Sequence, residues 1–279
     1  MAGRTSEVLK GEGTVAAKAE PVGPRLTVRS LTAGYGGTAV VRDINIDVYG
    51  GRITLIIGAN GSGKSTLAKC VAGVIPSMAG QIVLDGEDLT RARSDQRAKK
   101  GLGYVPQLRN VFDTLTVEEN LYVSGYTLDK RTLGERREFL RTIFPQLGVL
   151  SRQLAGNLSG GEKKMLATAR VLMLKPAAVI VDEPTAGLSP VLAQQFLSHE
   201  VRAIAAAGAA VLLIEQRAID ALRVADSACV MTAGQIQLHA SAEEVLALGE
   251  ERIIDTMLGG ASDAGEQQEA NRVNHRSPS

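Results

Sequence analysis

Residues 58–65 read "GANGSGKS" and follow the apolar stretch "RITLIIG" at 52–58. They fit the pattern G-x-x-x-x-G-K-[ST], in which glycines let successive backbone N–H groups face one anion and the following helix adds the partial positive charge of its N-terminus. Without a strand before it and a helix after it, the same pattern describes only a glycine-rich turn with a solvated lysine. Because both are expected here, the segment predicts a phosphate-binding loop in an α/β fold.

The side chains of this loop have separate expected tasks. Lys64 is expected to hold the β- and γ-phosphates of a nucleotide. Ser65 is expected to place its hydroxyl on Mg²⁺, a hard ion that takes oxygen ligands. The predicted nucleotide contacts in this region are Gly58, Asn60, Gly61, Ser62, Gly63, Lys64, Ser65 and Thr66.

A second candidate segment is "VIVDE" at 179–183, an apolar strand that ends in two carboxylates. Ligands of α/β proteins lie at the carboxyl ends of parallel strands. Asp182 is therefore suited to the Mg²⁺ shell, and Glu183 to orienting or deprotonating an attacking water. Adjacent acids can take different roles because side chains alternate along a strand. Taken alone, the pattern also fits a buried strand that merely ends in acids.

The pattern of apolar residues predicts the order of elements along the chain. Short β-branched segments between glycine-rich turns predict a small, mostly antiparallel sheet over 26–57. A helical pattern over 116–147 predicts a helical centre, and helices and strands that alternate from Gly160 onward predict a parallel sheet. Segments without apolar periodicity are predicted to be flexible tails, at 1–24 and 262–279.

Composition narrows the class of protein further. Of the 279 residues, 44% are hydrophobic, which is ample for a packed core. Since 31 Lys and Arg balance 30 Asp and Glu, no global field attracts nucleic acid, and no nucleic-acid partner is expected. Cys70 and Cys229 lack the spacing of a metal site or a disulfide framework. No membrane span or signal peptide is recognised, so a cytoplasmic location is predicted.

The segment "NLSGGEKKMLATARVLMLKP" at 157–176 identifies a family by resemblance. Its "LSGGE" matches the signature motif of the ATP-binding cassette (ABC) ATPases, and the resemblance covers roughly residues 25–260. It implies an α/β P-loop cassette that hydrolyses ATP with Mg²⁺. The implied domain, 25–261, has a mixed, mainly parallel core sheet, an N-terminal antiparallel β-subdomain and a helical subdomain at about 108–165.

The resemblance also implies roles for the signature residues. In the family, this motif closes over ATP bound to the other subunit of a dimer, which here would involve Ser159, Gly160, Gly161 and Glu162. A Ser at a helix start with Glu three residues later also fits a capping box, and both interpretations can hold. One cassette per chain then implies that two chains meet, as a homodimer or a heterodimer.

Other positions take their expected roles from the same resemblance. Tyr35 occupies the place of an aromatic that stacks on adenine, although a tyrosine in a surface turn is the alternative. Gln107 matches the glutamine that senses the γ-phosphate and Mg²⁺ and contacts the membrane partner. Gln216 stands where most cassettes place a His that contacts the γ-phosphate. Three apolar residues after Gln107 are expected in the groove for a membrane-subunit helix: Phe112, Leu115 and Val117.

The combination of "LTVEENL", "DEPTAGLSP" and "IEQ" resembles the ATPase subunits of branched-chain amino-acid importers and their amide or urea relatives. The usual signature segment there is SGGEQQMLAIGRALM, so Lys163 and Lys164 are departures, as is Arg217 after "IEQ". This resemblance implies a second ATPase subunit, two membrane permease subunits and a periplasmic or extracellular solute-binding protein. It places the chain peripherally on the inner face of the membrane. A soluble cassette in cofactor assembly and the ATPase of an exporter remain alternatives.

Overall fold

The computed structural model describes residues 23–107 and 111–259. The predicted tails, 1–24 and 262–279, lie outside the described residues except for positions 23 and 24, and the first strand begins at Pro24. Within the described residues, no helix is both long and apolar enough to span a bilayer.

The strands form two sheets, in agreement with the predicted fold class. The smaller sheet is antiparallel and has the order β2 (Thr38–Tyr49), β1 (Pro24–Tyr35), β4 (Ser77–Leu84), β5 (Glu87–Asp88). The larger sheet has the order β10 (Gln235–Ser241), β9 (Ser227–Thr232), β3 (Ile53–Ile57), β8 (Ala210–Glu215), β7 (Ala178–Asp182), β6 (Leu102–Val105). Its strands are parallel except for β10, which runs antiparallel to β9.

The predicted sheet is wrong for one strand. The stretch 52–57 was predicted to belong to the antiparallel sheet, but β3 lies in the larger sheet, between β8 and β9 and parallel to both. All five of its residues are buried. A continuous apolar run is typical of a parallel strand whose two faces are both covered, whereas the strands of an antiparallel sheet with one solvated face alternate.

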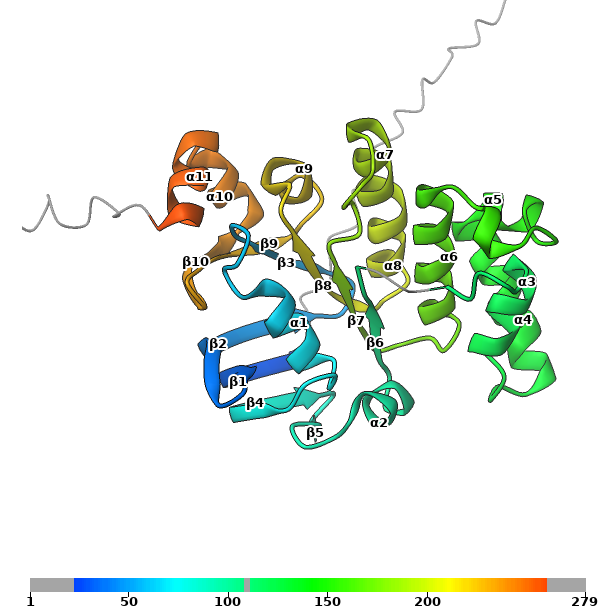
Figure 1. Cartoon of the computed structure of the whole chain (residues 1–279), viewed down its shortest axis with the longest axis horizontal. Coiled ribbons are helices and arrows are strands. Elements are labelled where there is room, and N and C mark those ends of the chain that lie inside the picture. The colour runs from blue at the N-terminus through cyan, green and yellow to red at the C-terminus, as the bar shows by residue number, and fades with distance from the viewer. Residues whose placement is uncertain (1–22, 108–110, 260–279) are drawn as a thin grey trace, which may run out of the picture.

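The helical subdomain lies at one end of the molecule, opposite the C-terminal helices α10 (Ala242–Ala247) and α11 (Glu250–Leu258) (Figure 1). Its helices are α3 (Val117–Ser124), α4 (Lys130–Ile143), α5 (Pro145–Val149) and α6 (Gly160–Leu172). The helical pattern predicted for 116–147 is therefore three helices. Local sequence sets the breaks: α3 ends at Gly125, the Asp129 side chain caps α4, and Pro145 begins α5.

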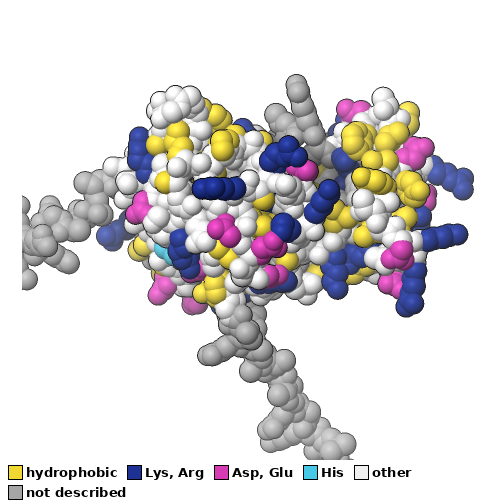
Figure 2. Space-filling model, turned by 90° about the horizontal axis from the view of Figure 1, so that it is seen from below, with side chains coloured by type: hydrophobic (Ala, Val, Ile, Leu, Met, Phe, Trp, Pro, Cys, Tyr) yellow, Lys and Arg dark blue, Asp and Glu magenta, His cyan; other side chains and the backbone are white. Residues whose placement is uncertain are grey.

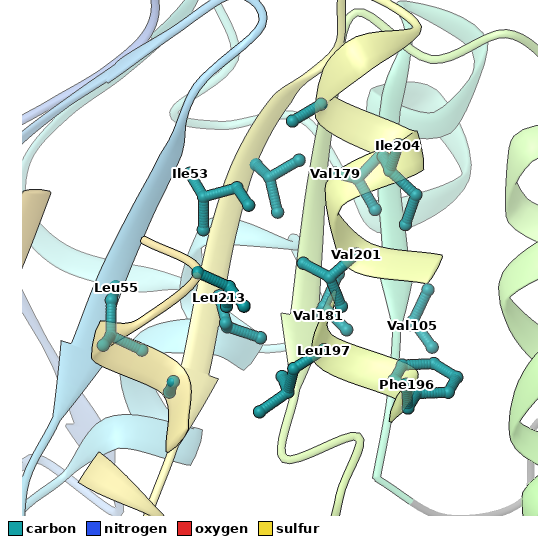
Figure 3. Packing of buried hydrophobic residues seen from close by; sticks show 14 of the residues in the cluster. Ile53, Leu55, Val105, Val179, Val181, Phe196, Leu197, Val201, Ile204 and Leu213 are labelled. Carbon is teal, nitrogen blue, oxygen red and sulfur yellow. The ribbon is translucent and has the colours of Figure 1, made fainter. Parts of the chain in front are cut away.

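A long helical run covers one face of the larger sheet. It comprises α7 (Pro190–Gln195), a π-helical turn (Phe196–Val201) and α8 (Arg202–Ala206). Figure 3 shows Leu197 and Val201 of this run facing Val181 on β7 and Leu213 on β8, and all four are fully buried. Each such aliphatic side chain contributes roughly 1.5–3 kcal/mol on burial. This packing fixes β7 and β8, whose carboxyl ends carry the candidate site.

Three further helices connect the strands. Helix α1 (Lys64–Val71) follows β3 and packs against the antiparallel sheet. Helix α2 (Ser94–Lys99) precedes β6, and α9 (Ala218–Leu222) follows β8. The register pairs Ile57 with Glu215 and Asp182 with Ile214, so β3, β7 and β8 end at one edge of the sheet. At that edge, the phosphate loop follows β3, Asp182 and Glu183 lie at the end of β7, and Gln216 follows β8.

Candidate nucleotide site

A cavity of about 280 Å³ lies over the phosphate loop. Residues far apart in sequence line it: Tyr35, Val40, Asn60, Gly61, Gly63, Lys64, Ser65, Thr66 and Glu183. The structure thus brings Tyr35, the loop and Glu183 together, as the sequence predicted. Tyr35 is 49% exposed, which leaves its ring free to meet a flat ligand such as a nucleobase.

The loop backbone depends on two of its glycines. Gly63 has φ +102°, and a Cβ there would lie 2.7 Å from Cγ1 of Val41. A Cβ on Gly58 would lie 2.3 Å from the carbonyl oxygen of Met231. Because a side chain would clash at either place, only glycine at these positions lets the loop pass close to β9 and enter α1.

Lys64 is 4% exposed, and its ammonium is bound by the loop itself. Nζ donates to the carbonyl oxygens of Gly58, at 2.8 Å, and Ala59, at 3.0 Å. Oε1 of Glu183 lies 3.9 Å from Nζ. Burial lowers the pKa of Lys64, whereas the nearby carboxylates of Glu183 and Asp182 act to raise it. A phosphate group can take the place of these carbonyl contacts and bring a full negative charge to the ammonium.

Asp182 is 3% exposed, and its two carboxylate oxygens have different surroundings. Oδ2 accepts a hydrogen bond from the Tyr104 hydroxyl at 3.2 Å. Oδ1 is buried and has no hydrogen-bond partner among the described residues. Burial raises the pKa of Asp182. A buried carboxylate oxygen without a partner is costly unless a cation is near, and together with the Ser65 hydroxyl it is an oxygen donor of the kind Mg²⁺ takes, so these residues fit that ion.

Glu183 is held beside Gln107. Nε2 of Gln107 donates to Oε2 of Glu183 at 2.9 Å, and the N–H of Glu183 donates to the carbonyl of Ile214 at 2.9 Å. Glu183 has φ +45°, a left-handed conformation that costs a residue with a side chain about 1–2 kcal/mol. Strain of this kind persists only where the surroundings hold the residue in place, and it is frequent at functional sites.

The buried strand β8 ends on a glutamate with an internal role. Glu215 is 1% exposed, and its carboxylate accepts the N–H of Thr185 at 2.9 Å and the N–H of Gln216 at 3.1 Å. Burial raises the pKa of Glu215, and these hydrogen bonds act against that rise. Glu215 therefore anchors the segment that follows Glu183.

Gln216 is exposed and lies beyond the end of β8. It lines a separate cavity of about 400 Å³ between α9 and α11, together with Arg217 and Asp220. It is not one of the described residues that line the cavity over the phosphate loop. The γ-phosphate contact predicted for Gln216 thus remains a prediction, favoured by its position one residue beyond Glu215 at the common strand edge.

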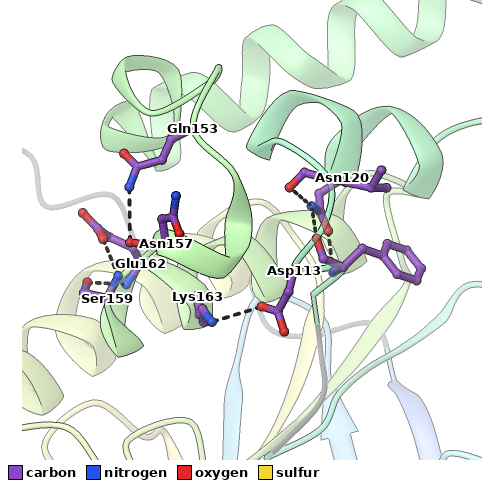
Figure 4. A network of polar contacts seen from close by, with 9 residues as sticks. Asp113, Asn120, Gln153, Asn157, Ser159, Glu162 and Lys163 are labelled. Atoms are coloured by element: carbon purple, nitrogen blue, oxygen red, sulfur yellow. Dashed lines mark hydrogen bonds and ion pairs between the residues drawn. The ribbon is translucent and has the colours of Figure 1, made fainter.

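The signature segment forms a capping box at the start of α6. The Ser159 side chain accepts the N–H of Glu162 at 3.3 Å, and the Glu162 side chain accepts the N–H of Ser159 at 2.7 Å (Figure 4). Lys163 donates to Asp113 at 3.0 Å. None of the described signature residues lines the loop cavity, and Gly160 and Gly161 leave open space around their Cα atoms. The cap and the predicted contact with a second subunit's nucleotide are compatible.

Two residues without a role in the sequence-based prediction lie beside the candidate site. Tyr104 lies three positions before Gln107, on β6, and its hydroxyl reaches Asp182 on the neighbouring strand. Lys164 reaches the backbone of Gln107 and Glu183. Two features of the sequence could have indicated these roles. Tyr104 carries a hydroxyl close to the predicted Gln107 loop, and Lys164 is a cation where the resembling sequences carry Gln.

The fold and the loop define a P-loop nucleoside triphosphatase. Residues 41–186 match the ABC transporter family, and the chain belongs to that family as an ATP-binding, ATP-hydrolysing subunit. Its structure is similar to the ADP conformation of an ATP-binding cassette of an ABC transporter, with a TM-score of 0.73 and 28% identity. That match covers 85% of this chain and 99% of the other.

Curated relatives include ATP-binding proteins of branched-chain amino acid transport and of lipopolysaccharide export. The chain is 38% identical to a probable branched-chain amino acid transport ATP-binding protein, LivF, of Archaeoglobus fulgidus, over 77% of this chain and 92% of the relative. It is 37% identical to a high-affinity branched-chain amino acid transport ATP-binding protein, BraG, of Pseudomonas aeruginosa, over 84% and 100%. It is also 29% identical to the lipopolysaccharide export system ATP-binding protein LptB of Escherichia coli, over 79% and 92%.

Proposed function

We propose that this chain powers an importer of branched-chain amino acids or of a related amide or urea solute. The observation that supports the solute class is the 37–38% identity to two branched-chain amino acid transport ATP-binding proteins along nearly their whole length. The identity to the lipopolysaccharide export protein is lower, at 29% over a similar length, and makes export the second candidate.

The proposed binding of ATP uses groups that the cavity already brings together. The phosphates lie against the loop and the N-terminus of α1, with Lys64 on the β- and γ-phosphates, and Tyr35 stacks on adenine. Asp182 and Ser65 would hold Mg²⁺, and the Gln107 side chain lies on the adjacent Glu183. The ion, when bound, neutralises charge on the phosphates.

Glu183 is the proposed catalytic residue. Its carboxylate lines the cavity and lies 3.9 Å from the Lys64 ammonium, next to the place that the loop gives the γ-phosphate. It orients a water and accepts its proton as the water attacks the γ-phosphorus in line with the leaving oxygen. The Gln107 amide now occupies Oε2, so this bond must loosen or share its acceptor before water can use that oxygen.

The proposed permease contact is a groove of about 490 Å³ between the core and the helical subdomain. Its lining includes Tyr104 and Pro106 on one side and Ala167 and Arg170 of α6 on the other. The Phe112 ring packs on the Arg170 guanidinium at 4.4 Å, so Phe112 lies beside the groove. Hydrophobic side chains gather at this end of the molecule when it is seen from below (Figure 2).

The contact predicted for Val117 is wrong. Val117 is fully buried as the first residue of α3, where it packs in the core of the helical subdomain and cannot meet a partner. Phe112, by contrast, is 46% exposed, and Leu115 is half-buried. A permease helix in this groove, a second ATPase subunit facing the signature and a solute-binding protein outside complete the proposed transporter, which holds the chain at the inner face of the membrane.

Solute uptake tests the proposed function. Deleting the gene in the source organism should abolish high-affinity uptake of labelled leucine, isoleucine and valine, because no ATP-driven closure remains to power transport. The wild-type gene should restore uptake, whereas Lys64→Ala should not, since it removes the cation of the phosphate loop. Unchanged uptake together with a loss of exported lipopolysaccharide would exclude the importer and support the export candidate.

Gln216→His should add a titrating group to the hydrolysis reaction. An amide carries no proton that dissociates near neutral pH, whereas an unperturbed imidazole has a pKa near 6.5. The variant is therefore expected to hydrolyse ATP with an extra ionisation between about pH 6 and 7 in its rate profile. The profile of kcat against pH is the measurement, and Gln235→His, an exposed glutamine on β10, is the control. A variant with the wild-type rate and profile would show that Gln216 does not meet the phosphate.

A further inference from the structure

Lys164 lies on α6, the helix that begins with the signature segment, and its ammonium contacts the backbone of Gln107 and Glu183. Nζ donates to the backbone carbonyl of Gln107 at 3.0 Å and to that of Glu183 at 3.5 Å. The side chains of the same two residues are joined by the 2.9 Å hydrogen bond from Gln107 to Glu183. One cation thus fixes the backbone on both sides of that bond.

Nearby carboxylates oppose the effect of burial on the Lys164 ammonium. Burial lowers its pKa, while the carboxylates of Glu215, Asp182 and Glu183 all act to raise it. The side chain is half-buried, so its hydrogen bonds compete less with water than those of a fully exposed lysine. A hydrogen bond from a charged donor to a carbonyl is stronger than one from a neutral donor.

The three residues come from three separate parts of the chain. Gln107 follows β6, Glu183 follows β7, and Lys164 lies in the first turns of α6, just after Ser159. Among the described hydrogen bonds, the carbonyl of Glu183 otherwise accepts only the N–H of Ala186, at 3.2 Å. The Lys164 side chain therefore connects α6 to the backbone of Glu183.

We propose that Lys164 is a positioning residue for ATP hydrolysis, which ties the Gln107–Glu183 pair to the signature helix so that α6 and the candidate catalytic carboxylate move together. This inference rests on the proposed role of Glu183. It concerns a feature particular to this chain, because the sequences it resembles usually carry Gln at positions 163 and 164. Gln is shorter and neutral, and it cannot hold two carbonyls with one charged group.

Four variants of the full-length chain test the proposal. Lys164→Met keeps the length and apolar stem of the side chain without its donors, and Lys164→Arg keeps the charge and restores the donors. Lys164→Gln introduces the residue of the resembling sequences. Lys163→Met is the matched control, because Lys163 is adjacent on the same helix and bonds only Asp113 among the contacts described for its ammonium.

Steady-state hydrolysis should separate positioning from binding. Lys164→Met is expected to lower kcat about 10- to 100-fold, as a misplaced catalytic group does, with KM for ATP within about twofold. Lys164→Arg should recover most of the rate, Lys164→Gln should lie between, and Lys163→Met should match the wild type. The affinity for a fluorescent ATP analogue should be unchanged in all four, which a merely structural role would not give.

Three results would overturn the inference. They are a wild-type kcat in Lys164→Met, an equal change of kcat and KM, and a loss in Lys163→Met as large as that in Lys164→Met. Glu183→Gln, measured in parallel, distinguishes this failure from that of the proposed function. If Glu183→Gln turns over normally, the role of Glu183 is wrong; if it is inactive while Lys164→Met is normal, only the positioning role of Lys164 fails.

Discussion

Glu183→Gln should bind ATP and lose turnover. Replacing a carboxylate by an isosteric amide removes the proton acceptor, an effect of about 10²–10⁴-fold on kcat. Binding should persist, because the loop, Lys64 and Asp182 are untouched and one negative charge beside the phosphates is gone. The measurements are phosphate release under saturating ATP and equilibrium binding of a fluorescent ATP analogue.

The structure supplies a matched control for this substitution. Asp113 is an exposed carboxylate outside the cavity, paired with Lys163 at the start of α6. Asp113→Asn removes one negative charge as Glu183→Gln does, but it should leave kcat within about twofold, because exposed ion pairs contribute only about 0–1 kcal/mol. Sustained hydrolysis by Glu183→Gln, with Asp113→Asn unchanged, would exclude Glu183 as the base and direct attention to a different acceptor.

The same variant bears on the resting arrangement of the site. In the wild type, Gln107 donates to Glu183, and an amide at position 183 can still accept that bond with its oxygen. Nucleotide binding and pair geometry are thus kept while the charge is removed. Glu183→Gln therefore tests proton transfer without a change in positioning. The Lys164 variants test positioning and leave the Glu183 carboxylate in place.

The parts of the nucleotide site that lie in contiguous motifs could be predicted from the sequence. The parts that depend on contacts between distant strands could not. The phosphate loop could be predicted because the glycines, Lys64 and the helix start that it needs lie within one short stretch. Asp182 and Glu183 could be placed because a buried strand ends at them. The ABC fold followed from the signature, and it is confirmed.

What the sequence missed depends on which side chains meet across the fold. Glu215 and Gln216 are adjacent polar residues at a strand end, but the first is buried against Thr185 and the second is exposed. Tyr104 gains its role only because β6 lies beside β7. The sheet assignment of β3 failed because local β-propensity does not say which partner a strand takes, and its uniform burial was the signal that favoured the parallel sheet.

Arg97 is a second residue whose contacts depend on the fold, and we expect these contacts to stabilise the folded state. It is on α2, is 1% exposed, and faces no carboxylate within the hydrogen bonds described for it. Its guanidinium donates instead to four backbone carbonyls, those of Cys70, Val71, Thr90 and Ala92, at 2.6–3.0 Å. Two of these carbonyls are at the C-terminus of α1, where a cation also complements the helix dipole.

Arg97→Met is expected to lower the free energy of unfolding by at least about 3 kcal/mol. The apolar stem is kept, but the carbonyls at the end of α1 lose a charged donor in a place that water cannot reach, and each unsatisfied buried group costs about 1–3 kcal/mol. Because α1 carries the phosphate loop at its other end, ATP should recover part of the loss by binding only the folded state. Urea unfolding with and without ATP is the measurement.

Lys99→Met and Arg97→Lys complete the experiment. Lys99 is an exposed cation on the same helix, so its loss should change stability by less than about 0.5 kcal/mol. Lys at position 97 keeps the charge but replaces a planar fork by one compact ammonium, so it should satisfy fewer carbonyls and give an intermediate loss, measurable even if Arg97→Met does not fold. Equal stability of all three variants would mean that water or a shifted backbone satisfies these carbonyls, and that Arg97 does not hold the end of α1.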